Sequence, residues 1–188
     1  MTYKYIITQS LAMLMSLASN AFEVKSGQPV VVSADTARME PVVKTALKML
    51  KGDIRKVLGL EMKLVNTSVN SSIILQRDAA AFAYKKEAFL LKSANGCLYI
   101  KGSDDHGLAY GILEVSRLLG VSPWEWWADA EPKQLKAFSL KEGYHNEQAP
   151  SVEYRGIFIN DEDWGLMPWS GKTYEPSDIP GHIGPKTN

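Results

Sequence analysis

The stretch "EAFLLKSANGCLYIKGSDDHGLAYGILEVSRLLG", residues 87–120, is the part of the sequence that decides the fold. Its first half, residues 87–103, alternates apolar and polar residues on both sides of Asn95 and Gly96. Asn-Gly between two alternating arms is the strongest short signal of a β-hairpin. We therefore expect two antiparallel strands, with Cys97, the single cysteine of the chain, as a small buried residue of the second strand.

Residues 104–120 complete the stretch with a helical pattern. Asp104 or Asp105 can cap this helix, because aspartate oxygens accept hydrogen bonds from the first free N–H groups of a helix. Gly107 and Gly111 are four residues apart, so one side of the helix can approach a sheet closely. The apolar residues repeat at intervals of three and four and predict one buried face: Leu108, Ile112, Val115, Leu118 and Leu119.

The same kinds of pattern continue toward the N-terminus. They predict, in chain order, a strand over residues 28–35, an amphipathic helix over 40–59, and strands over 60–66 and 70–77. Pro41 suits the first turn of the earlier helix and Gly59 its end, whereas Gly52 marks a point where it can break. The sequence thus predicts the α/β (α+β) fold class, with a small mixed sheet and two helices.

The composition argues against several classes of partner. Of the 188 residues, 21 are Lys or Arg and 21 are Asp or Glu, so the chain has no excess of basic residues for binding nucleic acid. One cysteine can form no internal disulfide, and the three histidines lack the spacing of a metal site. No phosphate-binding glycine loop and no Gly-x-Ser-x-Gly motif is present.

Residues 1–21 have the organisation of an export signal. Lys4 provides a short positive region, residues 6–17 an apolar core, and residues 19–21 a cleavage site with small side chains at its first and last positions. The apolar core is too short to span a membrane, so no membrane association is expected. An N-terminal helix of the fold is the alternative. With the signal removed, the mature chain begins near Phe22 and works outside the cytoplasm, in the periplasm of a bacterium.

Three tryptophans stand close together after the second helix: Trp124, Trp126 and Trp127. Tryptophan is costly to leave in water, so we favour an aromatic plug at a domain boundary over a flat platform for sugar rings. The polar residues 134–150 predict a linker with one strand-like piece at 137–140. Residues 22–133 then form one domain.

In the stretch "YRGIFINDEDWG", residues 154–165, an apolar run is followed directly by a cluster of acidic residues. A short buried strand would end at Ile159, with Asn160 and Asp161 directly after it. In parallel barrels, functional groups lie at the carboxyl ends of strands, and a carboxylate there can bind sugar hydroxyls or act as acid or base. A solvated turn or a helix cap explains the same acids equally well. Trp169, in the irregular segment that follows, is a further candidate for lining a site.

Four stretches together resemble the N-terminal part of glycoside hydrolase family 115, the xylan α-glucuronidases. They are "KGSDDHGLAYGILEVSRLLG" (101–120), "GVSPWEWWADA" (120–130), "YRGIFINDEDWGL" (154–166) and "KTYEPSDIPGHIGPKT" (172–187). The resemblance runs from about Phe22 to the end of the chain. The tryptophan motif and the "GIFINDED" motif are its most specific parts.

The resemblance implies an accessory domain similar to that of hexosaminidases, followed from residue 151 by the first strand of a (β/α)8 barrel that carries catalysis. It implies inverting hydrolysis, without a cofactor, that removes glucuronic acid or its 4-O-methyl ether from xylan or xylo-oligosaccharides. It places residues 157–161 in the first barrel strand. Asp161 is then the candidate catalytic residue, and Asn160, Asp161 and Trp169 are candidate substrate-binding residues.

Length is where the sequence departs from the family. A complete barrel needs about 250 residues, and inverting hydrolysis needs two carboxyl groups, usually on different elements. Residues 151–188 supply only one strand and its loop, so we expect this chain alone to be inactive and to lack the barrel and later domains of the same enzyme. A stand-alone carbohydrate-binding or scaffolding module built on the tryptophans is the alternative. The oligomeric state, a homodimer included, stays open.

Overall fold

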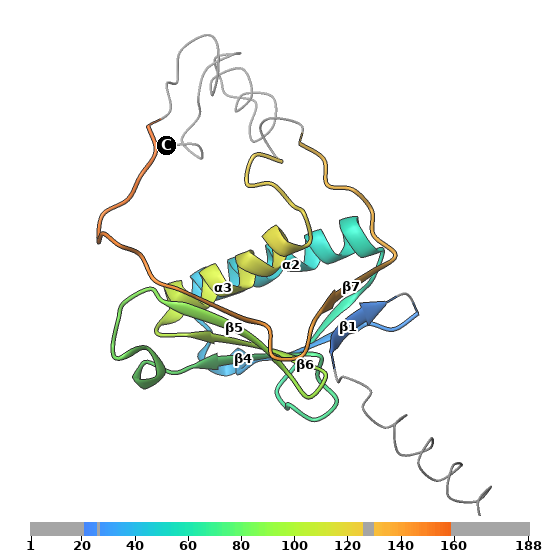
Figure 1. Cartoon of the computed structure of the whole chain (residues 1–188), viewed down its shortest axis with the longest axis horizontal. Coiled ribbons are helices and arrows are strands. Elements are labelled where there is room, and N and C mark those ends of the chain that lie inside the picture. The colour runs from blue at the N-terminus through green and yellow to red at the C-terminus, as the bar shows by residue number, and fades with distance from the viewer. Residues whose placement is uncertain (1–20, 26, 126–129, 159–188) are drawn as a thin grey trace, which may run out of the picture. The chain divides into compact units, whose positions relative to one another are not determined.

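The computed structural model describes residues 21–25, 27–125 and 130–158, and Figure 1 shows its chain path. The chain divides into two compact units, one of residues 1–125 with 130–150 and one of residues 126–129 with 151–188. Among the described residues, every helix and strand belongs to the first unit.

A six-stranded mixed sheet forms the centre of the first unit, with the strand order β3-β2-β4-β6-β5-β8. The first four of these strands run parallel to one another, whereas β5 runs antiparallel to both β6 and β8. The strands are β2 (Val30–Ser33), β3 (Met62–Val65), β4 (Ile73–Arg77), β5 (Phe89–Ala94), β6 (Cys97–Gly102) and β8 (His145–Gln148). The mixed sheet predicted from the sequence is thereby confirmed.

Two helices, α2 (Pro41–Leu58) and α3 (Asp105–Leu118), lie side by side on one face of this sheet, as Figure 1 shows. Pro41 takes the first position of α2, where its missing N–H costs nothing. Gly59 ends the helix with a φ of 67°, and its N–H donates to the carbonyl oxygen of Arg55. Gly52 does not break α2, which runs unbroken from β2 toward β3.

Helix α3 packs closely on the sheet, as its glycines predict. A Cβ atom at Gly107 would overlap the carbonyl oxygen of Ala88, and one at Gly111 would lie 2.8 Å from Cγ2 of Ile100 in β6. The side chain of Asp104 caps the helix by accepting a hydrogen bond of 2.8 Å from the N–H of Gly107. Both helices predicted from the sequence are therefore present, within one or two residues of their expected ends.

The hairpin of β5 and β6 turns at Asn95 and Gly96, which have φ angles of 53° and 75°. Two left-handed residues in a row are what a tight two-residue hairpin turn requires. Cys97 follows the turn and is only half-buried, with Sγ 3.4 Å from the carbonyl oxygen of Ser71. Its predicted burial was wrong, because Leu98 takes the covered face of β6 and leaves Cys97 on the other one.

The predicted linker of residues 134–150 contains two strands. The strand-like piece forms β7 (Ala137–Leu140), which pairs with β1 (Phe22–Lys25), and the rings of Phe22 and Phe138 meet edge to face with centroids 6.1 Å apart. β8 extends the main sheet beyond β5, and its Asn146 donates a 2.8 Å hydrogen bond to the buried carboxylate of Glu114 in α3. The sequence did not predict this strand, because its residues are polar. An edge strand is held by backbone hydrogen bonds and does not need apolar side chains.

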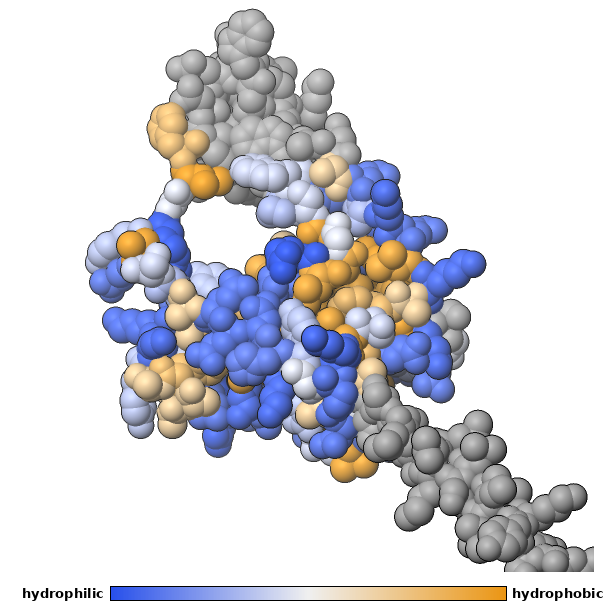
Figure 2. Space-filling view, in the orientation of Figure 1, coloured by the Kyte–Doolittle hydropathy of each residue, from blue (hydrophilic) through white to orange (hydrophobic). Residues whose placement is uncertain are grey.

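One hydrophobic core lies between the helices and the sheet and reaches β1 and β7. Each apolar side chain fully buried there stabilises the fold by about 1.5–3 kcal/mol. The surface in Figure 2 is mostly hydrophilic, with the largest group of apolar residues to the right of its centre and smaller groups elsewhere. Two short 3-10 helices, η1 (Thr36–Arg38) and η2 (Ala80–Phe82), complete the described elements. The largest fully buried side chains of the core are Phe22, Leu50, Ile73, Leu91, Leu98, Ile100 and Ile112.

Residues 151–158, the described part of the second unit, contain no strand. The predicted strand begins at Gly156, yet Ile157 and Phe158 are 72% and 90% exposed. No other strand pairs with this segment among the described residues, and an extended segment without a neighbour leaves its backbone groups to water. The strand prediction therefore fails over residues 156–158, because no described strand pairs with them.

Candidate functional site

The residues that the sequence predicts to act in catalysis and substrate binding lie outside the described part of the chain. They are Asn160, Asp161 and Trp169, together with Trp126 and Trp127 of the tryptophan cluster. Their assignments stay predictions. Trp124 is described, and 47% of its surface is exposed.

The turn that carries Trp124 is tied to α2. The N–H of Trp124 donates to Oγ of Ser122 at 3.1 Å, and the next residue, Glu125, forms an ion pair with Lys56. This pair raises the pKa of the Lys56 ammonium, chiefly through its hydrogen bond to Glu125. The turn thus has a defined place on the first unit, and it presents Trp124 partly to solvent.

The turn from β6 into α3 gathers several polar groups, which serve structure. Asp104 accepts hydrogen bonds from the N–H groups of Gly107 (2.8 Å) and Glu87 (2.7 Å). Burial raises the pKa of Asp104, but these two hydrogen bonds outweigh it and hold the pKa below its ordinary value. Ser103 is buried and accepts from the N–H of Ala88 at 2.9 Å. Since its oxygens are satisfied by backbone donors, Asp104 acts as a helix cap.

A hollow of about 290 Å³ lies at the carboxyl ends of β2 and β4, and we call it the edge hollow. Its charged lining consists of Asp35, Arg38, Arg77 and Asp105, and its apolar lining includes Met39 and Leu75. The carboxyl ends of parallel strands are the usual place for ligands in open α/β sheets. The sequence analysis did not identify this hollow, because its residues come from four separate elements.

The charges of the edge hollow are only partly paired. Arg77 donates from Nη1 to Oδ2 of Asp105 at 2.7 Å. Asp35 caps η1 by accepting from the N–H of Ala37 at 3.2 Å. Arg38 is exposed and forms no ion pair with any described residue. The hollow therefore offers one free guanidinium group beside carboxylate oxygens and an apolar wall.

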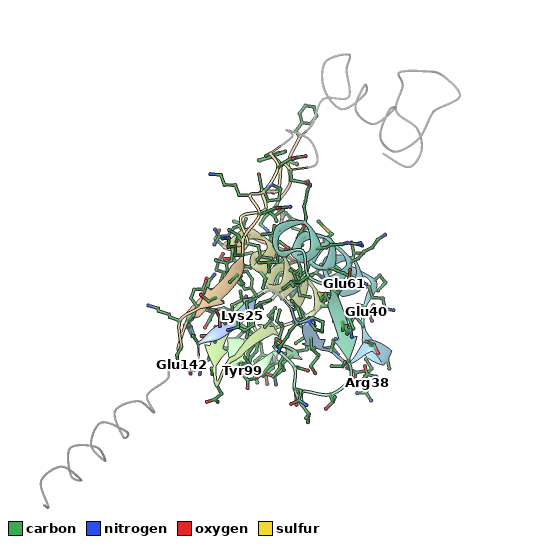
Figure 3. The ribbon with its side chains drawn as sticks, turned by 90° about the vertical axis from the view of Figure 1, so that its right-hand side faces the viewer. Lys25, Arg38, Glu40, Glu61, Tyr99 and Glu142 are labelled. Atoms are coloured by element: carbon green, nitrogen blue, oxygen red, sulfur yellow. The ribbon has the colours of Figure 1, made fainter. Side chains whose placement is uncertain are left out.

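A second hollow, of about 340 Å³, lies on the face of the sheet away from the helices. Tyr99 points to this side in Figure 3 and pairs across the strands with Lys92. Lys101 also lines the hollow and is held by Asp78 at 3.2 Å. No carboxylate lines this hollow among the described residues, so it lacks the paired carboxyl groups of a glycoside hydrolase site.

One carboxyl group of the first unit has a pKa above its ordinary value. Burial raises the pKa of Asp53 in α2, and Ser116 of α3 opposes that rise. A raised pKa is a property of catalytic acids, but Asp53 lies outside both hollows, and the carboxylate near it, Glu125, is paired with Lys56. Within the described residues no group of His, Cys, Asp and Glu could hold a metal ion, and no helix is long and apolar enough to cross a membrane.

Comparison with known proteins identifies what the chain resembles. The sequence pattern of the family described as "Glycosyl hydrolase family 115" matches residues 147–187 of the chain. A solved family GH115 4-O-methyl-α-glucuronidase, with specificity for decorated arabinogalactans, is 50% identical to the chain with a TM-score of 0.77. The match covers 89% of this chain and 23% of that protein, so the chain spans about a quarter of the relative's length. No curated protein sequence matches the chain.

More distant structures share only the fold. A β-hexosaminidase of Streptomyces plicatus is 18% identical with a TM-score of 0.52, and the GH20 β-N-acetylhexosaminidase of Streptomyces coelicolor A3(2) is 17% identical with a TM-score of 0.51. Each match covers 72% of this chain and 24% of the other protein. These likenesses confirm the α/β fold, similar to part of the hexosaminidases, that the sequence resemblance implied.

Proposed function

We propose that this chain, which belongs to glycosyl hydrolase family 115, is the N-terminal part of an exported enzyme that removes glucuronic acid or 4-O-methylglucuronic acid side groups from plant polysaccharides. The observation that carries the proposal is the 50% identity to a solved 4-O-methyl-α-glucuronidase over 89% of the chain. Identity at this level supports a shared domain and a shared place in the longer protein.

Catalysis in this proposal requires residues beyond those of the chain. Inverting hydrolysis uses one carboxyl group as acid and another as base, about 6.5–9.5 Å apart on opposite sides of the bond. Two carboxylates share the edge hollow, but Asp35 caps η1 and Asp105 pairs with Arg77. Asp161 is one carboxyl group on the first strand of the proposed barrel. The first unit then acts as an accessory domain, and the chain alone is inactive.

Two polysaccharides are candidate substrates, and both carry the same acidic side group. The family resemblance implies xylan, whereas the solved relative has specificity for decorated arabinogalactans. The name of the solved relative, a 4-O-methyl-α-glucuronidase, gives the side group that such an enzyme removes. The choice between them depends on contacts with the sugars beside that branch, which the remaining domains would contribute.

The test begins with the DNA that follows codon 188. If strand and helix units continue, the longer protein is expressed and incubated with glucuronoxylan and with acid-decorated arabinogalactan, and the released uronic acid is measured. We expect release from at least one polymer by the longer protein and none by residues 22–188. A stop codon directly after residue 188, or a folded longer protein that releases no acid from either polymer, would overturn the proposal.

The role of Asp161 is tested in the same longer protein. Replacing Asp161 with Ala should lower kcat by about 100-fold or more, the usual contribution of a group that positions or activates the reacting water. Asp163→Ala, two residues further along, is the matched control and should keep most of the activity. Near-normal turnover of the Asp161→Ala enzyme would remove this residue from the catalytic machinery.

Export is the remaining part of the proposal. Phe22 is fully buried at the start of β1, which supports a folded domain that begins where the predicted cleavage site ends. We expect the protein expressed with its own N-terminus to accumulate in the periplasm with Phe22 as its first residue. N-terminal sequencing checks this, and an intact Met1 on the accumulated protein would contradict it.

A binding module is the second candidate function, because Trp124 is 47% exposed on a turn with a defined place. A sugar ring stacked on this tryptophan would change its fluorescence. Titration of the folded chain with xylo-oligosaccharides should then give a saturable change that Trp124→Ala removes. If the fluorescence does not change during the titration, the binding role is excluded and the accessory-domain role remains for the first unit.

A further inference from the structure

We propose that the edge hollow binds a single uronic acid unit, with its carboxylate on Arg38. The identity of the ligand rests on the proposed function, which supplies an acidic sugar as the relevant chemistry. The site itself rests on the topology, the shape and the charges of the first unit. It would give the first unit a binding role of its own.

The position of the hollow follows from the order of the strands. β2 leads through α2 to β3 on one side, whereas β4 lies on the other side of β2 and continues the sheet toward β6. The chain therefore leaves β2 toward one edge of the sheet and leaves β4, the adjacent parallel strand, toward the other edge. Such a switch point opens a crevice outside the carboxyl ends of the strands, where open α/β sheets bind ligands.

The shape of the hollow follows from the unequal lengths of these strands. β2 ends at Ser33, which pairs with Ile74, while β4 continues to Arg77. The last three residues of β4 consequently have no partner on the β2 side. The chain after β2 turns away from β4 through Asp35 and η1. The space left beside the last residues of β4 is the edge hollow, about 290 Å³ in volume. That volume lies at the small end of ligand sites and suits one sugar unit.

The chemistry of the lining matches the three surfaces of a uronic acid. The carboxylate needs a cation, and Arg38 presents a planar guanidinium group that no described carboxylate neutralises. The ring hydroxyls need acceptors, which Asp35 and Asp105 provide. The apolar side of the ring needs a nonpolar wall, which Met39 and Leu75 form.

The start of α2 adds to the attraction for a negative charge. Its cap residue, Glu40, makes no side-chain hydrogen bond to the helix, and the first turn contains no acidic residue. Val43 of this turn lines the hollow. The positive end of the helix dipole and Arg38, which is labelled in Figure 3, therefore both border the hollow, and the negative charge of Glu40 offsets part of their attraction for an anion.

The test is calorimetric titration of residues 22–188 with D-glucuronate and, separately, with D-glucose. We expect saturable binding of glucuronate, and binding about tenfold or more weaker for glucose, which lacks the carboxylate. Arg38→Ala should weaken glucuronate binding by about tenfold or more and leave the fold intact, because Arg38 has no ion pair to lose. Arg55→Ala, on the exposed side of α2, is the matched control and should bind as the unmodified chain does.

Three results would overturn the site: no binding by a chain whose circular dichroism shows it folded, equal binding of glucose and glucuronate, or equal losses in Arg38→Ala and Arg55→Ala. Failure of the site is distinguishable from failure of the proposed function. Release of uronic acid by the longer protein tests the function and does not require the edge hollow. Glucuronate binding by the present chain tests the hollow and does not require activity.

Discussion

Two stretches of the chain have nearly the same local pattern and different structures. "LYIKGSDDHGL" (98–108) and "GIFINDEDWGL" (156–166) each run from apolar residues through a cluster of acids to glycine and leucine. The first forms the end of β6 and the start of α3, whereas residues 156–158 of the second are exposed and form no strand. β6 has β4 and β5 as neighbours on its two sides. The comparison teaches that an apolar run becomes a strand only where other strands can pair with it.

The acids of the first stretch also have partners that the chain itself supplies. Asp104 accepts from two backbone N–H groups, and Asp105 pairs with Arg77 of β4. These acids therefore stabilise the fold. For the second stretch, the sequence resemblance assigns Asp161 to a pocket built with later strands. The following substitutions test this contrast, from the largest expected effect on stability to the smallest.

Gly107→Ala should cause the largest loss, because its new Cβ would overlap the carbonyl oxygen of Ala88. Overpacking against a fixed backbone lowers the free energy of unfolding by about 3 kcal/mol. Urea denaturation followed by circular dichroism measures this change. Gly52→Ala is the control, since nothing lies within 4 Å of its added Cβ, and it should stabilise α2 by about 1 kcal/mol. Equal stability of the two variants would contradict the close packing of α3.

Asp104→Ala removes a helix cap together with the acceptor for Glu87 N–H, so the expected loss is about 2 kcal/mol at neutral pH. The pKa of Asp104 is lower in the folded chain than its ordinary 3.8. The charged form thus stabilises the fold above that ordinary value, and this stabilisation is lost as the pH falls through the folded pKa. Urea denaturation of both proteins should show the difference shrinking as the pH is lowered below about 4. A difference independent of pH would mean that the charge contributes nothing.

Asp105→Ala should have a smaller effect than Asp104→Ala, although the two acids are neighbours. Its ion pair with Arg77 lies near the surface, and its remaining contribution is the interaction with the positive end of α3. Together these are worth about 1 kcal/mol, and the loss should decrease at high salt. Denaturation in low and in molar salt measures it. A loss as large as that of Asp104→Ala would show that both acids act as caps.

Phe158→Ser should have the smallest effect on the stability of this chain, because the side chain is 90% exposed. A substitution at such a position changes the free energy of unfolding by less than about 0.5 kcal/mol. In the longer protein, where the proposed barrel would bury this residue, the same substitution should destabilise by about 3 kcal/mol or more. Equal small effects in both proteins would mean that residues 156–158 form no buried strand in either.

Much of the first unit could be predicted from the sequence, because its signals are local. Asn95 and Gly96 adopt the left-handed conformations of the predicted turn, and Pro41 and Gly59 bound α2 as expected. β8 was missed because edge strands are recognised by backbone pairing, which leaves no apolar pattern in residues 145–148. The edge hollow was missed because Arg38 and Arg77 are far apart in the sequence and meet only when β2 and β4 pair.

The sequence by itself determined the helices, the hairpin, the tight approach of α3 to the sheet and the resemblance to a family of glycoside hydrolases. These follow from residue spacing, turn chemistry and motifs that lie within a few residues of one another. Only the tertiary structure decided that Asp104 rather than Asp105 caps α3, that residues 145–148 extend the sheet, and that Arg38, which pairs with no carboxylate in the described part of the chain, lines a hollow at the ends of β2 and β4. The physical reason is that hydrogen bonds, burial and charge pairing depend on which distant segments come together, and local sequence does not specify those partners.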